Sequence, residues 1–282
     1  MQTMKEIFEE IETNGGMTPS RRLRDIENRF PEQIAFRDKR YGIWNEMSYK
    51  EFWMEVQYVG CALNYFGIQK TEKVAIHSEN RPEWLIADIG VQAIGGITVG
   101  LYPTNPPAEV QYLLSHSESK ILFAEDQEQV DKALEVLDEV PNLSKIIYFE
   151  EKGLFRYDSE KLMRWDEFLE IGKEEYEKNK DFVNFCIDEI KSEDVALMIY
   201  TSGTTGPPKA SMLSHGNMEW TASIIPDLSF TPNISNPEYL SYLPLCHVFG
   251  RLVDEIIAIN SIGTINFAES IDTVQRLSLI HI

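Results

Sequence analysis

Strand-like and helix-like segments alternate along residues 73–149, and this alternation constrains the fold more than any other feature of the sequence. Short apolar runs typical of buried strands occupy residues 73–77, 97–101, 121–124 and 145–149. Longer segments with helical character separate them, at residues 81–95, 106–117 and 126–137. Because helical crossovers join strands in parallel, we predict an α/β fold with mainly parallel sheets flanked by helices.

The flanking segments add further elements. Strands are predicted before and after this region, at residues 31–37, 44–48, 239–243 and 264–267, and partly helical structure at 245–259. A helix is predicted over residues 49–66, because Ser48 can cap it, an apolar stripe follows and Gly67 can close it. Residues 150–192 are polar and form an excursion, with a helix at 165–176. The run Arg21, Arg22 and Arg24 is interpreted as a solvated face.

Composition excludes some classes of protein. The 282 residues carry 46 acidic and 26 basic side chains, a net charge of −20, which argues against a nucleic-acid-binding surface. No apolar run approaches the length of a membrane span, and the N-terminus lacks a secretory signal. Cys61, Cys186 and Cys246 are widely spaced, which fits three unpaired thiols in a reducing compartment and no metal site. We expect a cytoplasmic protein and leave peripheral membrane contact open.

Residues 198–217 give the clearest indication of a functional site. An apolar run, 195–200, predicts a buried strand, and it leads into the hydroxyl- and glycine-rich loop Thr201, Ser202, Gly203, Thr204, Thr205 and Gly206. Glycines let backbone N–H groups approach an anion, hydroxyls add donors, and Lys209 adds one positive charge. The loop therefore predicts a phosphate site built mostly from neutral donors. A second short strand, 210–213, and a helix capped by Ser214 or Asn217 should follow.

This loop differs from the common P-loop, which requires Gly-Lys followed by Ser or Thr. Pro208 stands in the position of the second glycine, and Pro207-Pro208 prevents a helix from starting directly after the glycine turn.

The stretch closely resembles the signature loop of the AMP-forming adenylate-forming enzymes, which include acyl-CoA synthetases and firefly luciferase. The family pattern is Tyr-Thr-Ser-Gly-Thr-Thr-Gly-x-Pro-Lys-Gly. The chain matches it from Tyr200 to Gly206 and at Pro208 and Lys209, and departs at Ala210, where the family usually has glycine. About ten defined positions in one register make the match specific.

The stretch 243–251, Leu-Pro-Leu-Cys-His-Val-Phe-Gly-Arg, is similar to the same family, whose members often carry Pro-Leu-x-His-x-Phe here. The resemblance implies that His247 and Phe249 border the substrate carboxylate and acyl pocket, with His247 orienting the substrate. The softer resemblance of 249–251, 267–272 and 96–103 is to long-chain fatty acyl-CoA synthetases. His77, His116 and His215 are interpreted as structural, and helix 81–95 as ordinary core.

The resemblance implies an AMP-forming long-chain fatty acid–CoA ligase, with fatty acid, ATP and CoA as substrates and Mg²⁺ as cofactor. It assigns the β- and γ-phosphates to Thr201–Gly206 with Lys209 nearby, and a Mg²⁺ ligand to Thr201. The catalytic lysine of the family belongs to a C-terminal domain that has no counterpart here, and the family's adenine-stacking and ribose-binding motifs have no counterpart either. We therefore expect a partial AMP-binding domain over residues 1–275, a doubtful tail at 276–282, and a chain that is inactive alone.

Two other functions remain open. One is a superfamily enzyme that adenylates a different carboxylic acid, such as an amino acid or aryl acid. The other is a non-catalytic fragment that binds nucleotide or acyl groups. Oligomeric state and acyl-chain length have no signal in the sequence.

Overall fold

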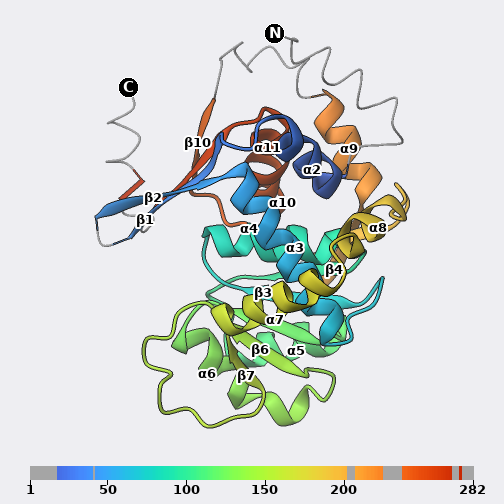
Figure 1. The fold of residues 1–282 in the computed structure, drawn as a ribbon. Helices are drawn as coiled ribbons and strands as arrows, with labels where there is room; N and C mark the ends of the chain where they lie inside the picture. Colours follow the sequence, from blue (N-terminus) through green and yellow to red (C-terminus); the bar gives the residue numbers. More distant parts are fainter. Residues whose placement is uncertain (1–17, 41, 202–206, 225–236, 269–272, 275–282) are drawn as a thin grey trace.

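The structure is a computed structural model that describes residues 18–40, 42–201, 207–224, 237–268 and 273–274 (Figure 1). The strands of these residues form two sheets. The larger sheet has the order β7-β6-β5-β3-β4-β8-β9. Its strands are β3 (Lys73–His77), β4 (Ile97–Leu101), β5 (Ile121–Ala124), β6 (Lys145–Tyr148), β7 (Leu162–Arg164), β8 (Val195–Thr201) and β9 (Lys209–Ser214).

Every pair in the larger sheet is parallel except β8 with β9, which is antiparallel. This arrangement confirms the predicted α/β fold. The four strands from β3 to β6 lie where the sequence placed them, because each is a short apolar run between helices. The parallel edge strand β7 was not predicted, since its three residues are only half-buried and give no apolar run.

The smaller sheet has the order β10-β11-β1-β2. It consists of β1 (Ile34–Arg40), β2 (Ile43–Ser48), β10 (Glu238–Ser241) and β11 (Thr264–Phe267). Strand β1 runs parallel to β11 and antiparallel to β2. The sheet therefore joins the first described strands of the chain to the last (Figure 1).

Helices fill the space between the sheets and cover the outer face of the larger one. They are α2 (Pro19–Arg29), α3 (Tyr49–Tyr65), α4 (Pro82–Ala93), α5 (Pro107–Ser117), α6 (Gln127–Glu135), α7 (Trp165–Lys178), α8 (Phe182–Asp188), α9 (His215–Ile224), α10 (Val248–Arg251) and α11 (Ala258–Asn260). A 3₁₀ turn follows α6 at Leu137–Glu139, and a π-helical segment, Leu252–Ile257, joins α10 to α11.

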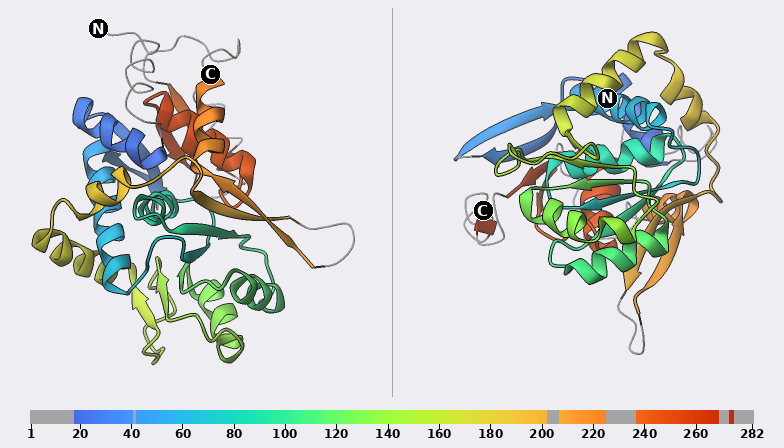
Figure 2. Two further views of the ribbon diagram at one scale, coloured as in Figure 1. Left: turned by 90° about the vertical axis from the view of Figure 1, so that its right-hand side faces the viewer. Right: turned by 90° about the horizontal axis from the view of Figure 1, so that it is seen from below.

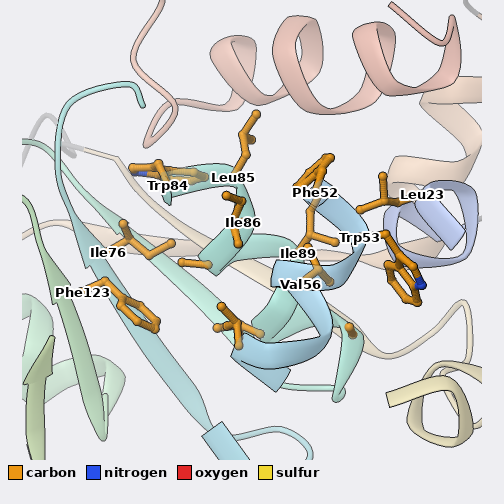
Figure 3. Packing of buried hydrophobic residues seen from close by; sticks show 14 of the residues in the cluster. Leu23, Phe52, Trp53, Val56, Ile76, Trp84, Leu85, Ile86, Ile89 and Phe123 are labelled. Carbon is orange, nitrogen blue, oxygen red and sulfur yellow. The ribbon is translucent and has the colours of Figure 1, made fainter. Parts of the chain in front are cut away.

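The main apolar core lies between the two sheets. Phe52 and Val56 of α3 and Trp84 of α4 pack there with Ile76 and Phe123 of the larger sheet (Figure 3). Phe36 and Phe267 extend the same cluster into the smaller sheet. A second cluster fills the other face of the larger sheet beneath α5 and α6. Burial along nearly all of α4 confirms its interpretation as core.

Helix α3 begins and ends as the sequence predicts. The Ser48 hydroxyl accepts from the Glu51 N–H, and the Glu51 carboxylate accepts from the Ser48 N–H, forming a capping box. Gly67, just after the helix, has φ +80°, a left-handed conformation that glycine adopts without steric cost. These local hydrogen bonds depend on adjacent residues, so the sequence suffices to place them.

The solvated face predicted for the arginine run is wrong. Arg22 is buried, and its Nε donates to the Asn260 side chain at 2.7 Å. Burial lowers the Arg22 pKa to about 10. The Arg21 guanidinium donates to the carbonyls of Ile187 and Ile190, at the C-terminal end of α8. Charge alone suggested exposure, whereas the arginines meet carbonyl and amide oxygens that only the fold brings near them.

Candidate nucleotide and acyl site

Strand β8 ends at the edge of the predicted phosphate loop. Its residues 196–200 are buried, and Thr201 is exposed. Across the hairpin, Thr201 is in register with Lys209, the first residue of β9, which is also exposed. The β8–β9 pair projects from the body of the molecule in both views of Figure 2. The structure therefore brings together Thr201 and Lys209, whereas Ser202, Gly203, Thr204, Thr205 and Gly206 lie outside the described residues.

The helix after β9 begins as predicted. Ser214 and Asn217 form reciprocal bonds: the Asn217 N–H donates to the Ser214 hydroxyl, and the Ser214 N–H donates to the Asn217 side chain. His215 follows the cap and is fully buried, and burial lowers its pKa to about 4. The imidazole is therefore neutral at pH 7, in keeping with the structural role expected for it.

Unlike His215, whose buried ring nitrogens have no hydrogen-bond partner among the described residues, the other two histidines interpreted as structural have defined ones. His77 is buried at the end of β3, with Nε2 3.0 Å from the Tyr102 carbonyl oxygen, and burial lowers its pKa to about 4. His116 Nδ1 lies 2.7 Å from the hydroxyl of Tyr200, inside the signature strand. That contact is absent from the sequence interpretation, because nothing in the local pattern links α5 to β8.

His247 stands at the start of α10. Its Nδ1 accepts from the Phe249 N–H at 3.2 Å, so the ring caps the helix and a neutral imidazole carries its proton on Nε2. Both His247 and Phe249 are exposed. Val248 and Tyr242, which follow the end of β10, are exposed as well.

Gly100 of β4 lies between the signature strand β8 and the segment that carries His247. Gly100 is in register with Ile199 of β8, two residues before Thr201. A Cβ on Gly100 would lie only 2.9 Å from the Cα of Cys246, the residue before His247. Since neighbouring strands are about 4.8 Å apart, the His247 segment packs over β4 one strand away from β8. The fold thus places Cys246, next to His247 in the chain, beside the strand that ends at Thr201.

Asn80, in the turn before α4, holds the segment that precedes His247. Its amide nitrogen donates to the Leu243 carbonyl at 2.7 Å and to the Ser241 hydroxyl at 2.9 Å, and its amide oxygen accepts from the Leu245 N–H at 2.9 Å. Ser241 in turn donates to the Asp254 carboxylate. Sequence analysis missed Asn80, because its partners are distant in the chain.

Arg251 fixes the same segment from the other side. Its Nε donates to the Leu245 carbonyl, and its guanidinium lies 4.7 Å from the ring centroid of Trp84. The charge is balanced by Asp88 at 3.0 Å, and both side chains are almost fully buried. Such a pair is costly to break, because removing one partner leaves a buried charge.

Two acids of the π-helical segment are buried as well. Burial raises the Asp254 pKa to about 7, with the Ser241 hydrogen bond opposing it. Burial and the nearby Asp88 raise the Glu255 pKa, and Gln92 donates to this carboxyl at 3.0 Å. Two carboxyl groups with raised pKa values therefore lie on the segment that follows α10.

The described residues contain no cluster of three histidine, cysteine, aspartate or glutamate side chains arranged for a metal ion. Mg²⁺ often takes few protein ligands and completes its shell with phosphate oxygens and water. The exposed Thr201 hydroxyl at the end of β8 fits that arrangement as a single ligand beside a bound polyphosphate. The three cysteines are free thiols.

The α/β fold thus carries Thr201 and Lys209 on neighbouring strands of the larger sheet and the His247 segment over the adjacent strand β4. The chain belongs to the AMP-binding enzyme family, whose model matches residues 23–281. This membership confirms the resemblance of the signature loop. Within the described residues, no helix has both the length and the apolar character needed to cross a bilayer.

Curated relatives carry the names of fatty acid ligases. The chain is 30% identical over 249 residues to long-chain-fatty-acid–CoA ligase ACSBG2 of Xenopus laevis, covering 88% of this chain and 33% of that protein. It is 30% identical over 261 residues to the human ACSBG2 ligase, covering 92% and 38%. The chain thus spans about a third of the length of these relatives.

Solved structures share the fold. A putative long-chain-fatty-acid CoA ligase from Rhodopseudomonas palustris superposes with a TM-score of 0.73 at 18% identity, covering 94% of this chain and 61% of that one. A Mycobacterium tuberculosis fatty acyl CoA synthetase gives 0.73 at 18%, covering 93% and 47%. An anthranilate CoA ligase gives 0.72 at 20%, covering 94% and 47%. At these identities the likeness establishes the architecture.

Proposed function

We propose that the complete protein is an AMP-forming long-chain fatty acid–CoA ligase, and that this chain supplies its phosphate loop and part of its acyl site. The observation that carries the proposal is the packing of Cys246 on Gly100, which sets His247 beside the strand that ends at Thr201. Family membership and the names of the curated relatives support the same reaction class.

The proposed reaction has two steps. A fatty acid carboxylate oxygen attacks the α-phosphorus of ATP, and the bond to pyrophosphate breaks, leaving an acyl-adenylate. The CoA thiol then attacks the acyl carbon, loses its proton and displaces AMP. In the first step negative charge grows on the departing pyrophosphate, so donors fixed around it lower the barrier.

The residues of this chain have distinct proposed roles. Thr201–Gly206 bind the β- and γ-phosphates through backbone N–H groups and hydroxyls, and Lys209 adds a positive charge from across the hairpin. His247 and Phe249 border the carboxylate and the start of the acyl chain. Bound Mg²⁺, with Thr201 as one ligand, supplies further charge neutralisation at the phosphates.

The first test measures binding of MgATP and magnesium tripolyphosphate to the chain by calorimetry. Lys209→Ala should weaken both, because it removes the positive charge beside the loop. Lys178→Ala is the matched control, since this exposed lysine pairs with Glu175 on α7. Equal affinities in wild type and Lys209→Ala would overturn the assignment of Lys209 to phosphate.

A second test separates the substrate classes. ATP–pyrophosphate exchange on the complete protein is measured with long-chain, short-chain, aryl and amino acids. Exchange that rises with acyl length supports the fatty acid assignment, and exchange confined to an aryl or amino acid replaces it with another adenylating activity. Nucleotide binding without exchange on any acid would favour a non-catalytic binding role.

A further inference from the structure

Both ends of the predicted phosphate loop are hydrogen-bonded to one helix, α5. The Tyr112 hydroxyl donates to the Pro208 carbonyl at 3.0 Å, just before β9, and His116 Nδ1 lies 2.7 Å from the Tyr200 hydroxyl, near the end of β8. We propose that Tyr112 and His116 are positioning residues that set the spacing of the loop ends and thereby its affinity for phosphate. The inference rests on the proposed function of the loop.

The two side chains act from one face of α5. Positions four residues apart lie one above the other on a helix. Here the Tyr112 and His116 rings stack, with centroids 5.4 Å apart and an interplanar angle of 29°. One side chain meets the β8 end and the other meets the β9 end. The pair therefore spans the hairpin.

The contacts from α5 lie where the pairing of the hairpin with the rest of the sheet ends. Parallel pairing of β8 with β4 runs from Leu197 to Ile199 and goes no further. Pairing of β8 with β9 continues to Thr201 and Lys209. Beyond Ile199 the hairpin is a two-stranded ribbon, and such ribbons are only marginally stable by themselves. The α5 contacts at Tyr200 and Pro208 support the part of the hairpin that does not pair with β4.

Helix α5 is a rigid base for this purpose. Its opposite face buries Val110, Leu113 and Leu114 in the core beneath the larger sheet. Burial also raises the pKa of Tyr200 to about 12, so the phenol that faces His116 keeps its proton at neutral pH.

Spacing matters because the loop binds with preorganised donors. Backbone N–H groups must converge on the same oxygens, and a displacement of about 1 Å can cost about a hundredfold in rate. Loss of one neutral, partly buried hydrogen bond should weaken polyphosphate binding about fivefold. Acyl contacts at His247 approach from the other side of the sheet and should be unaffected.

The test uses four variants of the 282-residue chain. Tyr112→Phe and His116→Leu each remove one contact, and His116→Asn keeps a polar atom near the Nδ1 position. Tyr157→Phe is the control, because its hydroxyl bonds Asp131 and Gln127 on α6 instead. Affinity for magnesium tripolyphosphate, hydrogen exchange of the amides at 200–201 and 209–210, and melting temperature are measured for each.

We expect Tyr112→Phe and His116→Leu to weaken binding about fivefold and to speed exchange at these amides, while His116→Asn and Tyr157→Phe behave like wild type. Unchanged exchange and affinity in both disruptive variants would overturn the inference while leaving the loop's function intact. Equal losses in His116→Asn and His116→Leu would also overturn it. If wild type fails to bind tripolyphosphate but exchange follows the expected order, the positioning role of Tyr112 and His116 is supported and the proposed function fails.

Discussion

Gly100→Ala should destabilise the protein by pushing the His247 segment off β4. The added Cβ would lie 2.9 Å from the Cα and 3.1 Å from the Cβ of Cys246. Atoms at such distances must separate by about half an ångström, and Cα belongs to the backbone, so the whole segment has to move.

Two opposing effects set the magnitude. Overpacking a well-packed interior costs about 1–3 kcal/mol. Replacing glycine by alanine in a compatible backbone gains about 0.4–1 kcal/mol by restricting the unfolded chain. The clash is the larger effect, and we expect a net loss that lowers the melting temperature by roughly 2–4 °C for a chain of this size.

Calorimetry measures the melting temperature, and the imidazole resonances of His247 report movement of the segment. Gly60→Ala is the matched control, because its nearest neighbours are the side-chain methyls of Val183 and Ile94, which can shift. Cys246→Ala should fail to rescue Gly100→Ala, since the closest atom is Cα. An unchanged melting temperature with unchanged His247 resonances would refute the packing of Cys246 on Gly100.

Three other outcomes follow from the same contacts. The pKa of Asp254 is raised to about 7 in the native state, against about 3.9 in the unfolded chain. Between these values the native state holds a proton that the unfolded chain releases. The contribution of Asp254 to stability therefore falls as the pH rises from about 4 to 7. Asp254→Asn should gain stability relative to wild type over that window in urea titrations, and a pH-independent difference would contradict this. Ser48→Ala should cost about 1 kcal/mol in urea unfolding by removing the α3 cap, whereas Ser48→Asn should cost little; equal losses would argue against the cap. The isolated 282-residue chain should release no AMP with palmitate, ATP and CoA, because the adenine, ribose and catalytic-lysine motifs have no counterpart in it; turnover near that of a full-length relative, abolished by Lys209→Ala, would show those motifs to be dispensable.

The sequence by itself determined the local structure and the family. The strands from β3 to β6 and the α3 cap follow from apolar runs and capping residues that lie close together in the chain. The signature loop was recognisable because its hydroxyl residues, glycines and lysine lie within one short stretch of the chain. Short-range interactions depend on neighbours in sequence, so pattern is enough to predict them.

Only the tertiary structure decided how the site is held together. The contacts of Gly100 with Cys246, of Asn80 with Leu243 and of His116 with Tyr200 each join residues far apart in the chain. The burial of Arg22, predicted to face solvent, has the same origin, since its partner Asn260 lies 238 residues further along the chain. A side chain's environment is set by whatever the folded sheets bring to it, and no local pattern of charge or hydrophobicity encodes that neighbour.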